Sequence, residues 1–210
     1  IILDDGFQHM AVQRDLNLVL FHADTLAGNS RVFPGGDLRE PIKALNRCDA
    51  FVLTYVCSRN RERAERFVAL LHERFPDKPV FFSSQEVDGL VSRSPGSEFT
   101  HKSKMLTGKV FGFCAIGQPD SFRHTLMDLG LEVVGFKTYA DHYAYKEEDI
   151  NKITHQAMEK GASALVATEK DIVKLGYAGS DLPLYAIRSS VKIEAEFSTL
   201  ISKVVEDRMA

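Results

Sequence analysis

The chain has 210 residues, of which 44% are hydrophobic and 26% are charged, and its formal net charge is −3. This composition is typical of a globular protein with one large domain or two small ones. The acidic balance argues against a nucleic-acid-binding protein, which needs a basic patch, and no apolar run approaches the roughly 18–20 residues of a membrane span.

Apolar strand-like runs alternate with helix-like runs along the whole chain. This alternation predicts an α/β fold with a parallel sheet and crossover helices. The expected strands are Ile1–Asp4, Leu16–Phe21, Ala50–Val56, Pro79–Ser84, Lys109–Ala115, Glu132–Thr138, Ala164–Ala167 and Leu184–Ile187.

Apolar residues at helical spacing predict amphipathic helices between several of these strands. One is expected over Asn60–Phe75, and a second begins near Pro119 and ends before Gly130, the positions that proline and glycine favour at helix ends. Two more are expected around Ile150–Ala157 and Phe197–Val205. They supply the helical layers of the predicted fold.

The stretch Gln85–Thr107 interrupts the alternation of strand-like and helix-like runs. It contains Ser92–Ser97, a cluster of turn-forming residues, so we predict a linker over residues 85–107 in which Val87–Val91 can form a short hairpin strand. The linker would separate a first domain at 1–84 from a second at 108–210.

Leu3–His9, with the sequence Leu-Asp-Asp-Gly-Phe-Gln-His, is the first candidate site. Asp4 and Asp5 would stand at the carboxyl end of a strand, where α/β proteins bind ligands and where an aspartate can hold Mg²⁺ against phosphate oxygens. Alternatively, Asp-Gly marks only a strand-to-turn junction. The partner motif of a nucleotide site, G-x-x-x-x-G-K-[ST], does not occur in the chain.

Gly28–Pro41 is a long glycine-rich loop that carries Arg31 and Arg39. Backbone freedom beside two arginines suits a loop that closes over phosphates, although a surface loop leading into a helix at Pro41 is the simpler interpretation.

Two further junctions follow predicted strands of the second half. A histidine placed like His142, beside Asp141, can act as a general base, or the pair can cap the next helix. Thr168 and Asp171 have the spacing of a helix N-cap, which explains them without a ligand.

Together these motifs resemble the tetraacyldisaccharide 4′-kinase family, the lipid A 4′-kinases. The resemblance runs in order along nearly the whole chain. It rests on Asp4–His9, Arg14–Leu16, Gly28-Asn29, Pro34–Gly36, Leu38–Pro41, Gly117, Pro119, Asp141-His142 and Thr168–Asp171.

The resemblance implies transfer of the γ-phosphate of ATP to the 4′-hydroxyl of a lipid A disaccharide 1-phosphate precursor. The expected location is the cytoplasmic face of the bacterial inner membrane, with peripheral attachment. It also implies a P-loop-NTPase-like parallel sheet, here partial, and a smaller C-terminal α/β domain joined by a hairpin-like linker.

The resemblance also assigns roles to residues. Asp4 and Asp5 would hold Mg²⁺. Gln8, Arg39 and Glu40 would lie near the nucleotide and its phosphates. His142, beside Asp141, would help to activate the sugar hydroxyl.

One departure concerns the family's N-terminal segment, which carries the membrane-associating helix, the P-loop and an aspartate partner of the histidine. The chain lacks it, so we expect this polypeptide to be inactive alone.

Two other classes of function remain open from the residues. One is a non-catalytic module that binds a nucleotide or metal. The other is a sugar-nucleotide transferase with an Asp-Asp metal site, which needs no P-loop. Testing sugar nucleotides against ATP as the donor substrate would distinguish a sugar-nucleotide transferase from a kinase.

Overall fold

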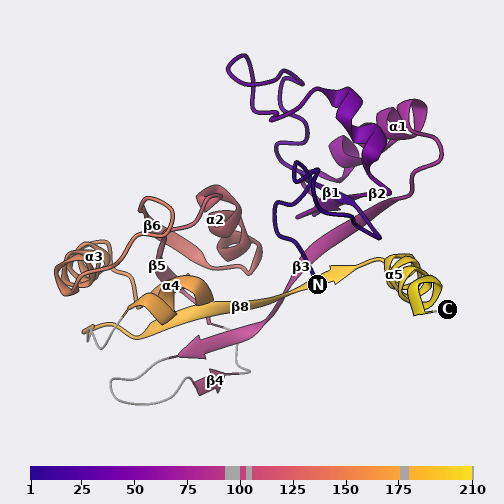
Figure 1. Ribbon diagram of the computed structural model, residues 1–210. Coiled ribbons are helices and arrows are strands. Elements are labelled where there is room, and N and C mark those ends of the chain that lie inside the picture. Colours follow the sequence, from indigo (N-terminus) through magenta and orange to yellow (C-terminus); the bar gives the residue numbers. More distant parts are fainter. Residues whose placement is uncertain (93–99, 103–105, 176–179, 210) are drawn as a thin grey trace. The chain divides into compact units, whose positions relative to one another are not determined.

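The computed structural model describes residues 1–92, 100–102, 106–175 and 180–209 (Figure 1). Strands and helices alternate, as the sequence predicts. The strands are β1 (Leu18–His22), β2 (Ala50–Thr54), β3 (Val80–Ser92), β4 (Thr100–Lys102), β5 (Lys109–Cys114), β6 (Glu132–Thr138), β7 (Ala164–Thr168) and β8 (Leu184–Ile193). The helices are the 3₁₀ helix η1 (Ile42–Arg47), α1 (Arg61–Arg74), α2 (Pro119–Asp128), α3 (Glu147–Glu159), α4 (Glu169–Lys174) and α5 (Ala195–Met209).

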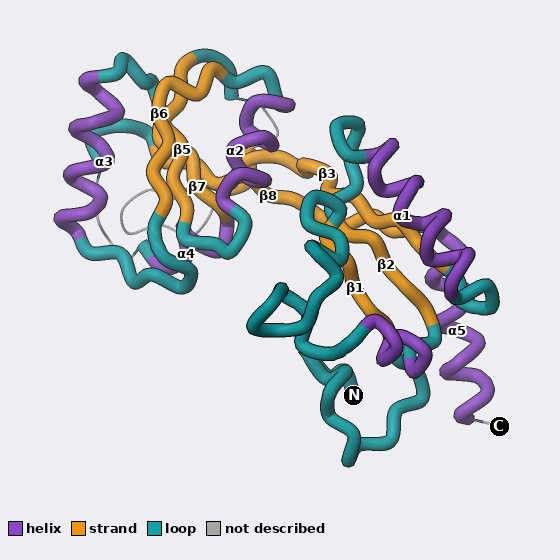
Figure 2. Tube along the Cα trace, turned by 90° about the horizontal axis from the view of Figure 1, so that it is seen from above, coloured by secondary structure: helices purple, strands orange, loops and turns teal. Residues whose placement is uncertain are grey.

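The strands are hydrogen-bonded in the order β1-β2-β3-β8-β7-β5-β6, and β4 pairs with β3 outside this path. The pairs β1–β2, β2–β3, β5–β6, β5–β7 and β7–β8 are all parallel. Figure 2 shows the helices flanking these strands. The α/β class predicted from the alternation is therefore confirmed.

The chain divides into two compact units. Unit 1 comprises Ile1–Glu86 and Val191–Ala210, and unit 2 comprises Val87–Ser190. The segment from Val191 onward thus groups with unit 1, whereas the sequence analysis placed it in the second domain. Packing explains the grouping: the Phe197 ring of α5 meets Phe81 of β3 edge-on at 5.4 Å.

In unit 1, alternate residues of β3 pack against helices on opposite faces of the sheet. Val80 and Phe82 pack toward the cluster that contains Ala64 and Leu71 of α1, whereas Phe81 contacts α5. Because successive strand residues point to opposite faces, α1 and α5 cover opposite faces of this part of the sheet.

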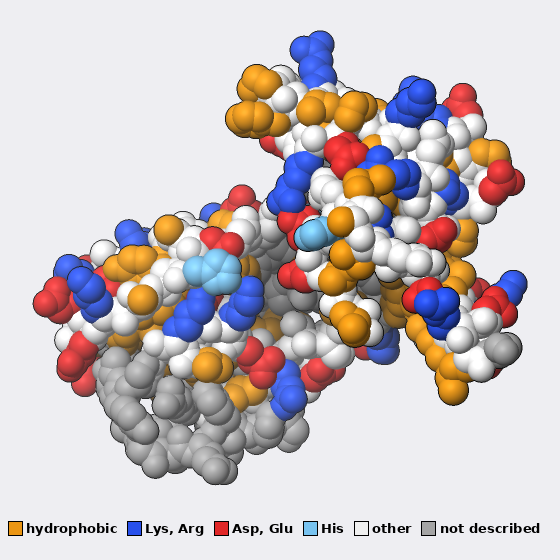
Figure 3. Space-filling model, in the orientation of Figure 1, with side chains coloured by type: hydrophobic (Ala, Val, Ile, Leu, Met, Phe, Trp, Pro, Cys, Tyr) orange, Lys and Arg blue, Asp and Glu red, His pale blue; other side chains and the backbone are white. Residues whose placement is uncertain are grey.

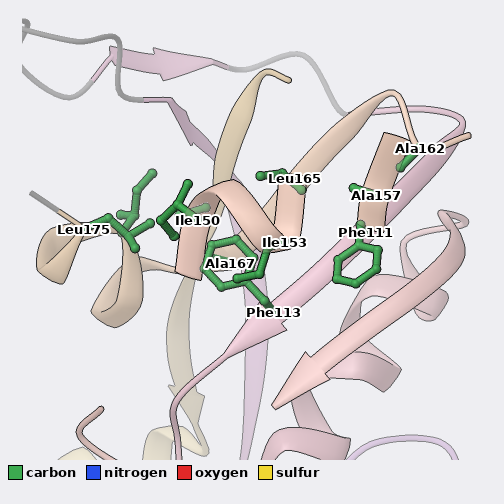
Figure 4. Packing of buried hydrophobic residues seen from close by; sticks show 11 residues of the cluster. Phe111, Phe113, Ile150, Ile153, Ala157, Ala162, Leu165, Ala167 and Leu175 are labelled. Atoms are coloured by element: carbon green, nitrogen blue, oxygen red, sulfur yellow. The ribbon is translucent and has the colours of Figure 1, made fainter. Parts of the chain in front are cut away.

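In unit 2, successive residues of β5 likewise pack on opposite faces of the sheet. Phe111 and Phe113 pack with Ile150 and Ile153 of α3 and with Ile172 of α4 (Figure 4). The intervening residues of β5 turn to the other face, where they pack against α2 in a second cluster. Helices therefore bury both faces of this part of the sheet, as parallel strands require.

The predicted first strand, Ile1–Asp4, is wrong. Residues 1–3 have no strand partner among the described residues, and Ile1, Ile2 and Leu3 are exposed to solvent. Hydrophobic β-branched residues favour a strand, but a strand forms only where another one accepts and donates its backbone hydrogen bonds.

The predicted linker, residues 85–107, is partly strand. β3 extends through it as far as Ser92, and Leu90–Ser92 pair antiparallel with Thr100–Lys102 of β4. The short hairpin strand expected at Val87–Val91 is thus present as the end of a longer strand. Residues 93–99 and 103–105 of this linker lie outside the described part of the chain.

We predict that Leu165→Ala lowers the free energy of unfolding by about 2–5 kcal/mol, because Leu165 is fully buried in the cluster of Figure 4 and its loss leaves a cavity. Leu70→Ala, at an exposed site on α1, is the matched control and should change stability by less than about 0.5 kcal/mol. Urea denaturation of both variants measures the difference. Equal effects would contradict the assignment of this core.

Candidate functional site

The acidic segment of unit 1 forms a tight turn. Asp5 adopts a left-handed conformation, with φ of 52°, and its carboxylate accepts a hydrogen bond from the Arg39 guanidinium. The Arg14 side chain donates to the Gly6 carbonyl at 2.5 Å and also to that of Phe7. These contacts fix the turn although it has no strand before it.

A second contact joins the acidic segment to the segment around Arg39. Glu40 accepts from Arg47 of η1 at 2.6 Å, and the Arg47 guanidinium lies over the Phe7 ring, 4.7 Å from its centroid. Residues more than 30 positions apart in the sequence therefore form one cluster. Of the candidate residues, the structure joins Asp5 directly to Arg39, whereas Gln8 is exposed and, among the described residues, its side chain bonds to neither.

The glycine-rich loop is held by its own polar groups. Asn29 donates to the Gly35 carbonyl at 2.8 Å and accepts from the Arg31 amide at 3.0 Å. A bridge between Val32 and Leu38 closes its base. The loop is thus ordered by internal bonds, and it leads directly to Arg39.

The carboxylates of Asp4 and Asp5 suit Mg²⁺ only as a partial ligand set. The described residues contain no group of three or more His, Cys, Asp or Glu side chains placed to hold a metal ion. Mg²⁺ is commonly bound by one or two carboxylates and completes its octahedron with phosphate oxygens and water. Asp4 and Asp5 are both exposed, and Asp5 lies beside Arg39, which fits that mode of binding.

The surface of the protein carries charges of both signs. On the face seen in Figure 3, Lys and Arg side chains are interspersed with Asp and Glu over both units. The Asp5–Arg39 pair is itself well exposed, with side-chain accessibilities of 62% and 67%. An exposed ion pair contributes at most about 1 kcal/mol, so a phosphate can compete for the arginine at little cost.

The candidate pair of unit 2 follows β6. Asp141 accepts from the backbone N–H of His142 at 2.9 Å, and its second oxygen lies 3.9 Å from Nε2 of the imidazole. His142 has a φ of 60°, and its side chain is 74% exposed. The imidazole is therefore presented to solvent with a carboxylate beside it, an arrangement that suits proton transfer to or from a bound group.

The segment after β5 lies beside this pair. A side chain on Gly117 would begin 3.7 Å from the Asp141 carboxylate, so the loops after β5 and β6 meet at the carboxyl edge of the parallel strands. This edge is where α/β sheets bind ligands.

The predicted N-cap at Thr168 is confirmed. Its hydroxyl accepts from the Asp171 amide at 3.2 Å and begins α4. The sequence analysis did not anticipate that Asp171 is fully buried and bonded to two other segments. Only the spacing of a cap was visible in the sequence, because the other partners are 26 and 56 residues away.

Comparison with known proteins decides the family. The sequence model of the family described as tetraacyldisaccharide-1-P 4′-kinase matches residues 1–206. The chain belongs to this kinase family. The family resemblance inferred from the motifs is thereby confirmed.

Individual 4′-kinases agree. The tetraacyldisaccharide 4′-kinase of Desulfotalea psychrophila is 43% identical over 203 residues, which cover 97% of this chain and 57% of that protein. That of Syntrophus aciditrophicus is 34% identical and is covered over 58% of its length. The chain thus spans a little over half the length of these 4′-kinases.

A solved structure of the same family is similar in fold. The crystal structure of the "apo" form of LpxK from Aquifex aeolicus in complex with ATP aligns with a TM-score of 0.61 at 29% identity. The alignment covers 95% of this chain and 55% of that one.

The described part of this 4′-kinase family member contains no helix with both the length and the apolar character that a membrane span requires.

For the glycine-rich loop of this 4′-kinase family member, we predict that Gly36→Ala opens the loop. A methyl group at Gly36 would overlap the Asn29 side-chain oxygen and the Arg31 carbonyl. Such overpacking costs about 1–3 kcal/mol, which should raise tryptic cleavage after Arg31 at least about fivefold.

Gly35→Ala is the matched control, since its nearest neighbour would lie at 3.5 Å, an ordinary contact. Limited proteolysis with identification of the cut sites measures both variants. Unchanged cleavage in Gly36→Ala would show that the loop does not depend on this close approach.

Proposed function

We propose that the complete protein containing this chain transfers the γ-phosphoryl group of ATP to the 4′-hydroxyl of a tetraacyldisaccharide 1-phosphate, a lipid A precursor. The observation that carries the proposal is the contact of Asp5 with Arg39 in a member of a 4′-kinase family. This contact places the Asp5 carboxylate, next to Asp4 in the sequence, against a guanidinium, and phosphoryl transfer uses groups of these kinds for charge neutralisation.

In this proposal Asp4 and Asp5 hold Mg²⁺, which when bound neutralises charge on the β- and γ-phosphates of ATP. Arg39 leaves the Asp5 carboxylate and donates to phosphate oxygens, for which its planar guanidinium is suited. Gln8 lies three residues after Asp5 and contacts the nucleotide or its phosphates. Glu40 keeps Arg47 over Phe7 and thereby supports the turn.

His142 acts on the acceptor. Its exposed imidazole receives or relays the proton of the 4′-hydroxyl as the phosphoryl group is transferred, and the Asp141 carboxylate lies beside it. The Asp141–His142 pair thus belongs to the acceptor side of the reaction, and the Asp4–Asp5 turn belongs to the ATP side.

Three finer assignments are part of the same proposal. Unit 1 corresponds to part of a P-loop-NTPase-like core, with residues 108–190 as the main part of a smaller C-terminal α/β domain. The complete protein attaches peripherally to the cytoplasmic face of the inner membrane, where its lipid substrate is. The 210-residue chain has no G-x-x-x-x-G-K-[ST] motif and is inactive alone.

His142→Ala tests the proposal in the complete enzyme. We expect kcat for transfer from ATP to the tetraacyldisaccharide 1-phosphate to fall about 10²–10⁴-fold, the usual contribution of general acid–base catalysis. The KM for ATP should stay within about twofold, because the residue acts on the acceptor.

His155→Ala is the matched control. This histidine is an exposed residue of α3 in the same unit and pairs with Glu159. Its removal should leave kcat within about twofold. If His142→Ala retained the kcat of the parent enzyme, His142 would have no part in catalysis.

A further inference from the structure

Within the described part of unit 2, one carboxylate is completely buried. Asp171 lies in the first turn of α4, and its side chain has no exposed surface. A carboxylate is tolerated in such a place only where hydrogen-bond donors replace the water that it has lost. The segments that supply those donors are therefore fixed by Asp171.

Three groups donate to this carboxylate. The Ala115 amide and the Tyr145 hydroxyl reach Oδ1 at 3.2 and 3.1 Å, and the Thr168 hydroxyl reaches Oδ2 at 2.6 Å. Ala115 directly follows β5, Tyr145 lies in the segment after β6, and Thr168 ends β7. One side chain thus connects three neighbouring segments at the carboxyl edge of the parallel strands.

The segment after β6 is the one that carries Asp141 and His142. It runs over residues 139–146 between β6 and α3, and His142 stands in it with a left-handed backbone. The ring of Tyr145 packs edge-on against Phe113 at 5.7 Å, and its hydroxyl bonds to Asp171. Tyr145 therefore attaches this segment to the core, three residues after His142.

A second tyrosine also holds this segment, and its ring contacts that of Tyr145 with centroids 5.6 Å apart. The Tyr143 hydroxyl donates to Asp149 of α3 at 3.1 Å, and Tyr139 stacks on the Tyr143 ring with centroids 4.7 Å apart. The hydroxyls of Tyr143 and Tyr145 each donate to a carboxylate, but only the partner of Tyr145, Asp171, is completely buried.

We propose that Asp171 is a positioning residue that, through the Tyr145 hydroxyl, holds the backbone of residues 139–146 so that His142 meets the acceptor hydroxyl. The proposal rests on the role of His142 given under the proposed function. It adds a residue that touches neither substrate but sets the geometry of one that does.

The chemistry of the bond fits this role. Burial, followed by the charge of Asp171, raises the pKa of the Tyr145 hydroxyl. The hydroxyl is therefore protonated throughout the neutral range and remains a donor to the carboxylate. Burial likewise raises the pKa of the neighbouring Cys114 thiol to about 12, so no thiolate forms beside Asp171 at neutral pH.

A helix cap alone would also explain the Thr168–Asp171 bond, and the two roles make different predictions. A cap stabilises α4, and its loss lowers stability without acting through His142. A positioning residue changes kcat through His142. A test of the Tyr145 hydroxyl separates them, because this hydroxyl takes no part in the cap.

Tyr145→Phe in the complete enzyme removes the hydroxyl and keeps the ring on Phe113. We expect kcat to fall about 10- to 100-fold, the effect of misplacing a reacting group, with the KM for ATP unchanged. Thr154→Val is the matched control, since it removes a buried hydroxyl that bonds to the Ile150 carbonyl and to the Ser180 hydroxyl, neither of which belongs to residues 139–146. It should leave kcat within about twofold.

The same change in a His142→Ala background tests the route of the effect. If Tyr145 acts through His142, Tyr145→Phe causes no further fall in kcat there, so the two effects are not additive. An equal fall in both backgrounds, or no fall in the parent enzyme, would overturn the proposal.

A measurement on the complete enzyme is independent of activity. The backbone amide resonance of His142 in a ¹H–¹⁵N spectrum should shift in Tyr145→Phe and stay in place in Thr154→Val. An unmoved resonance in Tyr145→Phe overturns the positioning role. If His142→Ala left kcat unchanged, the role of His142 would fail by itself, and this spectrum would still decide whether the Asp171–Tyr145 bond positions the segment.

Discussion

The ion pair between Asp5 and Arg39 is the contact on which the proposed ATP side of this protein depends. It joins an acidic turn to the end of a glycine-rich loop 34 residues later. Both partners are well exposed, so the pair adds little to stability and can exchange for a phosphate and a metal ion. Arg14 bonds to the backbone of the turn and Arg47 lies over the Phe7 ring, and in the proposed function both would hold the turn in place during that exchange.

In unit 2, the corresponding constraint is a buried carboxylate, that of Asp171, which fixes the segment that carries His142. In the proposed mechanism His142 is exposed so that it can meet an acceptor, but an exposed side chain on a loop is poorly fixed. Asp171 supplies the missing constraint, because its burial requires donors from three segments and one of them carries His142. An exposed ion pair that exchanges and a buried carboxylate that does not thus have complementary roles.

Much of the fold was predictable because its signals are local. Helix α2 begins at Pro119 and ends before Gly130, and β6 has the predicted bounds, since each depends on residues close in sequence. Ile1–Asp4 failed because a strand depends on a partner as well as on its own residues. β3 and β8 run beyond their predicted ends, because their apolar cores mark only part of each strand.

The candidate site likewise has a part that the sequence predicts and a part that it does not. Asp4, Asp5, Arg39 and His142 stand in recognisable motifs, so sequence alone singled them out, although their proposed roles are still to be tested. The Asp5–Arg39 contact and the partners of Asp171 were beyond prediction, because they join residues up to 56 positions apart. Distant pairings of this kind are set by topology, which a single sequence does not display.

The Mg²⁺ dependence of phosphoryl transfer by the complete enzyme tests the central claim most directly. In Asp5→Asn, the Mg²⁺ concentration for half-maximal activity should rise at least about tenfold, because a ligand to the ion has lost its charge. Asp77→Asn, at an exposed turn of the same unit, should leave it unchanged. An unaltered Mg²⁺ requirement in Asp5→Asn would contradict the assignment of this turn as the metal-holding part of a kinase site.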